Sequence, residues 1–261
     1  MRELGEQILL TMTSAAHNLS CMRAVILQPG YLPWVGFFDL AAKSDIFVIL
    51  DCVQFDKRSW RNRNRIRTAT GWQWLTVPVL TKGRFTQRID ETMIDNTHNW
   101  AHKHLAAIRT CYARAPYLKE FWPLLSEALS RRWERLLDLD MYLIKMIDDA
   151  FQLGTNYVMA SSLSPSGRKA DLILEICKIV GADHYLNGDM GRSYLEPGPF
   201  EANGIKLEFH NYTHPIYPQC YDGFESHMSA IDLLLNCGAD GRRYILRRAE
   251  PVKEPDMGPM K

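Results

Sequence analysis

Two side chains in this sequence have the type and position expected of a proton-transferring group. Asp51 follows directly after the apolar run 46–50, IFVIL, and His214 opens the proline-containing segment 214–219, HPIYPQ. Carboxylate and imidazole groups are common general bases in enzymes. The alternatives are structural, because Asp51 can cap the turn that follows it and a loop histidine often makes only hydrogen bonds.

Polar and cationic residues precede a predicted helix in the segment 164–169, SPSGRK. The helix is predicted from the apolar spacing of residues 170–180 and the glycine at 181. Free backbone amides at a helix N-terminus favour a phosphate or carboxylate. A second polar loop, 187–192, follows another predicted strand. The residues that we assign to anion binding here are Ser166, Arg168, Lys169 and Gly188. The alternative is an ordinary helix cap at Ser164 or Ser166 with exposed cations.

The segment 62–79 is predicted to be a β-hairpin with a cationic, aromatic face. Three arginines at every second position precede a turn at Gly71, and two tryptophans follow it. Guanidinium groups clamp phosphates, so this face suits a phosphate or a sugar. The candidate ligand contacts are Asn62, Arg63 and Trp74. The alternative is a solvated face on which arginines stack on tryptophans. Nucleic acid is a less favoured partner, because only this segment is basic.

Histidines near residue 100 raise two further hypotheses. His98 and His102 lie four residues apart, as zinc-binding histidines on a helix do, but no glutamate follows His98 and no third ligand is evident. A metal site is therefore not predicted. Lys103 and His104 can contact an anion, or they can be ordinary surface residues.

A strand, loop, helix and second strand position the first group of candidates. The apolar runs 24–27 and 46–50 flank a proline-rich loop and the helical spacing of residues 36–43. Such a unit predicts two parallel strands, and ligands of parallel sheets bind beyond the carboxyl ends of the strands. The residues expected around this crevice are Gln28, Tyr31, Trp34, Asp51 and Gln54.

The rest of the chain repeats this organisation. Residues 157–186 predict a second strand, helix and strand, of which the first strand is 157–163, YVMASSL. Residues 99–153 are predicted to be helical with a break at Pro116. A short strand at 205–210 and a helix at 229–236 complete the pattern. We therefore predict an α/β fold: a parallel sheet built from two β-α-β units, with the helical stretch as an insertion or subdomain.

Composition restricts the class of protein. The 261 residues are 46% apolar, carry a formal charge of +1, and contain no apolar run near the ~20 residues that cross a bilayer. Six cysteines without a CxxC pair indicate reduced thiols in the cytoplasm. We expect one domain at 22–248 between disordered segments at 1–21 and 249–261. Met22, directly before the first strand, is a candidate translation start.

Eight sequence segments carry a family resemblance. They are QPGYLPWVGFFD, LDCVQF, RNRNRIRT, WLTVPV, SPSGRKADLI, YLNGDMGRSYL, HPIYPQ and SAIDLLLNCG. In this order they resemble the WbqC-like family of bacterial surface-polysaccharide gene clusters, over residues 22–240. The resemblance implies glycine or aminoacyl transfer onto a sugar or another amine. This chain departs from the family at Asp51 and Cys52, where two acids are frequent.

A second resemblance is to nucleotidyltransferase-like α/β domains, whose first loop has a proline-rich turn before a histidine-glycine-histidine signature. The segment 33–37, PWVGF, keeps the proline and glycine but has Trp34 and Phe37 at the histidine positions. Those histidines would stabilise a phosphate in the transition state, so their replacement argues against ordinary adenylyl transfer.

Together these features predict an enzyme of transfer or ligation chemistry, in polysaccharide or secondary-metabolite biosynthesis. Asp51 or His214 would be the base, and ATP or another nucleotide would be the cofactor. Arg63, Arg168 and Lys169 would hold a phosphate- or carboxylate-bearing substrate, for which aminoacyl-tRNA is one conceivable donor. The aromatic wall would consist of Tyr31, Trp34 and Trp74, and Tyr217 is a further candidate substrate contact. The alternatives are a non-catalytic module that binds a sugar nucleotide or a protein, and a divergent nucleotidyltransferase.

Overall fold

A five-stranded parallel sheet is the centre of the computed structural model, which describes residues 21–57 and 59–246. The strands are β1 (Arg23–Leu27), β2 (Ile46–Ile49), β5 (Tyr157–Met159), β6 (His184–Asn187) and β7 (Lys206–Phe209). Their order is β5-β2-β1-β6-β7, and every neighbouring pair is parallel. The predicted α/β class with a parallel sheet is confirmed.

Successive side chains along the strands point to opposite faces of the sheet, and they form an apolar core on each face. Val25 and Phe47 pack into the core that includes α2 (Val35–Ala42), whereas Ala24 and Val48 face the core that includes α7 (Ala170–Ile179). Side chains along a strand point alternately to opposite faces, so both faces of these central strands are covered. The predicted unit of β1, α2 and β2 is therefore present.

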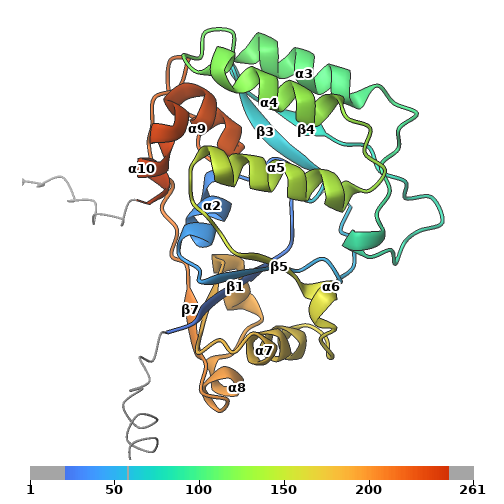
Figure 1. Cartoon of the computed structure of the whole chain (residues 1–261), viewed down its shortest axis with the longest axis vertical. Coiled ribbons are helices and arrows are strands. Elements are labelled where there is room, and N and C mark those ends of the chain that lie inside the picture. Colours follow the sequence, from blue (N-terminus) through green and yellow to red (C-terminus); the bar gives the residue numbers. More distant parts are fainter. Residues whose placement is uncertain (1–20, 58, 247–261) are drawn as a thin grey trace, which may run out of the picture.

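The long excursion between β2 and β5 contains a two-stranded antiparallel sheet and three helices. The hairpin consists of β3 (Arg63–Thr68) and β4 (Gly71–Thr76), and the helices are α3 (Trp100–Cys111), α4 (Leu118–Ser130) and α5 (Leu136–Ala150). Figure 1 shows these elements together above the parallel sheet. The predicted helical stretch and its break near Pro116 are confirmed.

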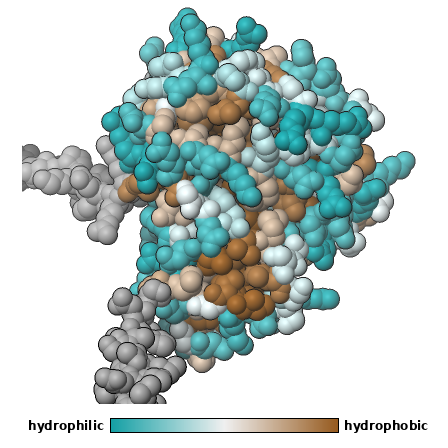
Figure 2. Space-filling view, viewed as in Figure 1, coloured by the Kyte–Doolittle hydropathy of each residue, from teal (hydrophilic) through white to brown (hydrophobic). Residues whose placement is uncertain are grey.

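Shorter elements complete the chain. They are the 3-10 helices η1 (Ile89–Glu91), η2 (Asp189–Ser193) and η3 (Gly238–Gly241), and the helices α6 (Ala160–Leu163), α8 (Pro197–Glu201), α9 (Ala230–Cys237) and α10 (Arg242–Ile245). Figure 2 shows a hydrophobic area on the lower half of the viewed face, where Figure 1 draws α6 and α7. None of the described helices combines the length and hydropathy needed to cross a bilayer.

Two local predictions are wrong. The expected strand at 157–163 ends at Met159, where the chain enters α6. The expected serine cap of α7 is absent, because Lys169 occupies the cap position and no side chain closes this helix end. The reason is the backbone: Ser164 ends α6 in a left-handed conformation, and the chain needs five more residues to turn into α7. The predictions for residues 1–20 and 249–261, including the disorder assigned to them, fall outside the described residues.

Candidate functional site

A cavity of about 510 Å³ lies where β2 and β5 end, and we call it the Asp51 cavity. Residues that follow both strands line it, together with residues from η1 and the beginning of α5. The lining residues are Asp51, Arg84, Asp90, Glu91, Met93, Arg135, Leu137, Met159 and Ser161. This is the carboxyl edge of the parallel sheet, where the sequence predicts a ligand.

The carboxylate of Asp51 is held firmly at this edge. Asp51 is only 1% exposed, and it accepts hydrogen bonds from the Ser161 amide at 2.8 Å and the Ser161 hydroxyl at 2.5 Å. Ser161 lies in the first turn of α6, so Asp51 caps that helix. A carboxylate has about four acceptor positions, and these two bonds leave capacity for a further donor from the cavity.

Charges around the cavity are unevenly paired. Arg88 is bonded to Asp90, with Nη2 2.5 Å and Nε 3.0 Å from its carboxylate oxygens, and its amide donates to Glu91. Arg84 and Arg135, in contrast, are exposed and have no ion-pair partner among residues 21–57 and 59–246. Such guanidinium groups can bind an anionic group of a ligand, while the nearby buried carboxylate can remove a proton from the same ligand.

Gln54 supports this cavity indirectly. Its Nε2 donates to the carbonyl of Phe85 at 2.8 Å, and its backbone forms a bridge to Arg88. These contacts fix the segment that contributes Arg84. Gln54 itself does not line the Asp51 cavity. It supports the cavity only through its contacts with the backbone of the segment 84–88.

Gln28 and Tyr31 lie in the loop after β1 but do not line the cavity. The Arg61 guanidinium donates to the carbonyls of Gln28 and Pro29 at 3.0 Å each. Tyr31 is fully buried, and its hydroxyl lies 2.9 Å from His104 Nδ1. Tyr31 therefore cannot form part of an open aromatic wall.

His104 is part of the same buried pair. Burial lowers the pKa of His104 to about 4 and raises the pKa of Tyr31 well above its usual value. Both groups are consequently neutral at pH 7. Lys103, by contrast, is exposed and lines a separate cavity of about 380 Å³ together with Trp74.

His214 belongs to an aromatic cluster that is distinct from the Asp51 cavity. Its ring lies 4.8 Å from that of His227, which stacks on Trp34 at 5.6 Å. Burial lowers the pKa of His214 to about 4. Because Nδ1 contacts the carbonyl of Pro215 at 2.9 Å, the proton belongs on Nδ1 and Nε2 carries the lone pair. The structure therefore does not place His214 beside Asp51.

Tyr217 neighbours this cluster but serves a buried network. It is 3% exposed, and its hydroxyl donates to Asp232 Oδ2 at 2.8 Å. Tyr112 and Gln219 donate to the same carboxylate at 2.9 and 2.7 Å. The network connects α9 to the hairpin and to α3, which is a structural role.

Two of the three predicted arginines, Arg63 and Arg65, share an exposed face with tryptophans, and we call it the Trp–Arg surface. The prediction is wrong for Arg67, which is 3% exposed and donates to the carbonyls of Gly71 and Asp222. The guanidinium carbon of Arg63 lies 4.3 Å from the ring centre of Trp74. That of Arg65 lies 4.9 Å from Trp72 and 5.4 Å from Trp60. The three tryptophans remain 37–43% exposed. Asn62 is buried instead, and it donates to the Val77 carbonyl at 2.7 Å.

The remaining predicted anion ligands lie apart from these sites. Ser166, Arg168 and Lys169 are exposed in the loop between α6 and α7, outside the lining of the Asp51 cavity. Gly188 follows β6 and is half-buried. His98 and His102 are exposed, and no third possible metal ligand joins them within the described part of the chain.

Asp51 is the only lining residue that the sequence analysis identifies as a candidate. Among the lining residues that it misses, Ser161, Arg84 and Arg135 are the ones that can position the carboxylate or hold an anion. The sequence gives no indication that Ser161 contacts Asp51, because the pattern predicts a strand for its segment. Arg84 follows the turn residues Lys82 and Gly83, and Arg135 precedes a helix, so neither position carries a local signal of function. Only the folding of the excursion over the end of β2 brings them together.

Comparison with known proteins adds a family and one relative. The model of the WbqC-like protein family matches residues 28–244. The chain is also similar to a protein of Mycobacterium tuberculosis (strain ATCC 25618 / H37Rv) named "Uncharacterized protein Rv1507c", with 36% identity over 225 residues that cover 85% of this chain and 97% of the relative. No solved structure matches the chain.

Proposed function

This chain belongs to the WbqC-like protein family, and we propose that it is a transferase or ligase whose anionic small-molecule substrate binds in the Asp51 cavity. One observation carries the proposal: a buried carboxylate, fixed by Ser161, opens into a cavity whose lining includes the unpaired cations Arg84 and Arg135. That combination provides a base and an anion clamp within one space.

The proposed chemistry is attack by an amine or hydroxyl on an activated acyl or phosphoryl group. The new bond forms as the bond to the activating group breaks, and that group leaves as a phosphate, a pyrophosphate, a nucleotide or a tRNA. Asp51 removes the proton of the attacking group, and the two arginines hold the phosphate or carboxylate of the substrate. A positioned general base contributes about 10²–10⁴-fold to the rate. Ser161 acts as a positioning residue, because its two hydrogen bonds set the direction of the carboxylate.

Supporting arguments for the substrate are of two kinds. The cationic side chains favour a phosphate- or carboxylate-bearing molecule, such as ATP, a sugar nucleotide or an amino acid. The family resemblance supports aminoacyl transfer to an amino sugar in polysaccharide or secondary-metabolite biosynthesis, with aminoacyl-tRNA as a further donor to be tested.

The test is turnover with defined mixtures. We would incubate the protein with ATP, single amino acids and amino-sugar nucleotides, and follow pyrophosphate release and product mass. A second series would replace ATP and the amino acid by charged tRNA. Product formation that depends on Asp51 but not on the exposed Asp56 supports the proposal. Binding without conversion across both series would contradict it.

The Trp–Arg surface favours a second candidate function, a non-catalytic module that binds a sugar nucleotide. Exposed indoles can stack on a sugar or base, while guanidinium groups pair with the diphosphate. Replacing Trp72 by Ala should then weaken binding of UDP-sugars by about tenfold, since a stacked ring is worth ~1–3 kcal/mol. Leu124→Ala, an exposed apolar residue on α4, serves as the control.

A divergent nucleotidyltransferase is supported less well. Phe37, at the second histidine position of that signature, is only 3% exposed and packs against Phe38 and Phe47. It lies in the core and cannot contact a phosphate.

A further inference from the structure

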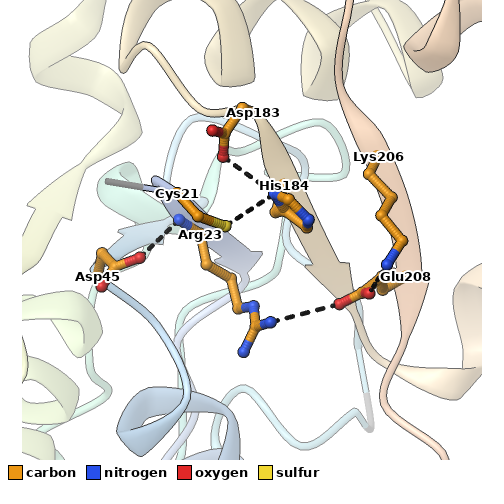
Figure 3. Close-up of polar contacts among 7 residues, drawn as sticks. All are labelled: Cys21, Arg23, Asp45, Asp183, His184, Lys206 and Glu208. Carbon is orange, nitrogen blue, oxygen red and sulfur yellow. Dashed lines mark hydrogen bonds and ion pairs between the residues drawn. The ribbon is translucent and has the colours of Figure 1, made fainter. Parts of the chain in front are cut away.

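Three possible metal ligands of different chemistry meet at the edge of the sheet opposite to the Asp51 cavity. Cys21 precedes β1, and Asp183 and His184 lie at the beginning of β6. The two strands are neighbours, with Arg23 opposite His184. The sulfur, carboxylate and imidazole ligand atoms lie within 4.8 Å of one another (Figure 3), and we call these residues the Cys21 cluster.

The contacts inside the cluster converge on a single nitrogen. Cys21 Sγ lies 2.9 Å and Asp183 Oδ1 lies 3.0 Å from His184 Nδ1. A catalytic Cys-His-Asp arrangement would need the carboxylate on the other ring nitrogen. Here one nitrogen faces both partners, and the Cys21 thiol also bonds to the Asp183 carboxylate, so each of the three ligand atoms contacts the other two. Lone pairs of three donors that point to one place are what a cation requires.

We propose that the Cys21 cluster binds a divalent transition metal ion, for which Zn²⁺ is the best match. Thiolate, imidazole and carboxylate are the protein ligands of zinc. Zinc bonds of about 2.3 Å to sulfur and 2.0–2.1 Å to nitrogen place those two atoms roughly 3.5 Å apart at a tetrahedral angle. The exposed Cys21 side chain needs to move by less than about 1 Å to provide this spacing. Water occupies the fourth position, and the thiol releases its proton to solvent on binding.

The surrounding charges do not oppose a cation. The guanidinium of Arg23 is directed away from the cluster to Glu208, at 3.7 Å, and Lys206 lies 2.5 Å from the same carboxylate (Figure 3). Asp45, which accepts the Arg23 amide at 2.7 Å, adds a negative charge nearby. Glu208 and Asp45 together balance the charges of Arg23 and Lys206, so the carboxylate and thiolate of the cluster itself provide the attraction for a cation.

A metal here would clamp the start of the central strand to its neighbour. The β1 and β6 pairing extends over only two residue pairs, Arg23 with His184 and Ala24 with Tyr185. A bridge from Cys21 to β6 would reinforce this end of the short ladder, where the Asp183 and His184 amides already donate to the Met22 carbonyl at 3.2 Å each. The role is structural and independent of the function proposed for the Asp51 cavity.

The experiment uses the full chain after chelator treatment, titrated with Co²⁺ and then Zn²⁺. We expect one ion per chain by elemental analysis, a thiolate-to-cobalt charge-transfer band, and a higher melting temperature with Zn²⁺. Cys21→Ser should abolish the band, and His184→Gln should weaken the affinity for metal at least about tenfold. Both side chains are partly exposed, so circular dichroism should show that both variants fold.

Matched controls separate this site from adventitious binding. Cys220→Ser removes a half-buried thiol elsewhere in the chain, and His98→Gln removes an exposed histidine that lies 3.4 Å from Asp95. Both controls should bind Co²⁺ as the unmodified chain does. A wild-type chain without the charge-transfer band, or a band that persists in Cys21→Ser, would overturn the proposal.

Discussion

Asp51 and Ser161 join the ends of two neighbouring strands through a two-point hydrogen bond. The amide of Ser161 donates at 2.8 Å and its hydroxyl at 2.5 Å, although 110 positions separate the residues. The bond gives Asp51 a structural role in capping α6 as well as the proposed role as a base. Structural and catalytic roles can be separated because they respond differently to the same substitution.

Asp51→Asn is expected to keep the fold and lose activity. The amide oxygen still accepts from the Ser161 backbone, and the amide nitrogen can donate to the Ser161 hydroxyl, so stability should change by less than about 1 kcal/mol. The rate should fall by about 10²-fold or more, because an amide is not a base. Melting temperature and product formation check the two expectations. A variant that turns over at the wild-type rate would remove Asp51 from the mechanism.

Replacing Arg84 and Arg135 by Ala should weaken anion binding with little effect on stability. Each charge-assisted hydrogen bond is worth about 1.5–3 kcal/mol when desolvated, and both side chains are exposed in the free protein. Isothermal titration with ATP and with inorganic phosphate measures the change. Arg132→Ala is the control, because this nearby arginine is exposed and paired with Glu134 at 2.7 Å. An equal loss in control and test variants would indicate only a change in overall charge.

The sequence predicts the sheet better than it predicts the site. Apolar runs and helical spacing suffice for β1, α2 and β2, because each is a local pattern whose apolar residues must be buried. The position of Asp51 at a carboxyl edge follows directly from that pattern. The alternation of Arg63 and Arg65 likewise suffices to predict the shared face of the hairpin.

Long-range packing decides the rest. Arg84 and Arg135 come from segments without periodicity, and the excursion between β2 and β5 brings them over the sheet edge. Tyr31 and Tyr217 resemble ligand-binding aromatics in sequence, but each hydroxyl has a buried partner that is far away in the chain. A single sequence gives no sign of such partners.

Lys169→Gly is expected to stabilise the protein. Lys169 has φ +51° and ψ −123°, a conformation that favours glycine. Relief of this strain should add up to about 1 kcal/mol to the free energy of unfolding, less the entropy that glycine adds to the unfolded chain. Lys169→Ala keeps the strain and removes the same charge, so it is the matched control in a urea titration. Equal stabilities of the two variants would show that relief of the strain does no more than offset the entropy cost of glycine, which contradicts the prediction.

The pair Lys169→Ala and Arg168→Ala also tests the predicted anion site of the α7 loop. Both side chains are exposed, and their loss leaves the apolar face of α7 intact. Phosphate affinity should fall if the loop recognises an anion, because two cations near the helix N-terminus are removed. The melting temperature should remain nearly constant. Unchanged phosphate binding in the double variant would show that the loop does not recognise an anion.

His104 should make the protein sensitive to acid. Its folded pKa of about 4 lies below the usual value near 6.5, so between these pH values the unfolded chain binds a proton that the native chain does not. Stability is therefore retained above about pH 6.5 and is lost as the pH falls toward 4. For one such histidine the loss between pH 7 and pH 5 is roughly 2 kcal/mol. His104→Gln should show a correspondingly smaller loss in urea titrations at the two pH values, despite a weaker bond to Tyr31. His98→Gln, at an exposed position, should keep the full dependence. If the free energy of unfolding of His104→Gln falls between pH 7 and pH 5 as much as that of the wild type, other groups, such as His214, cause the acid sensitivity.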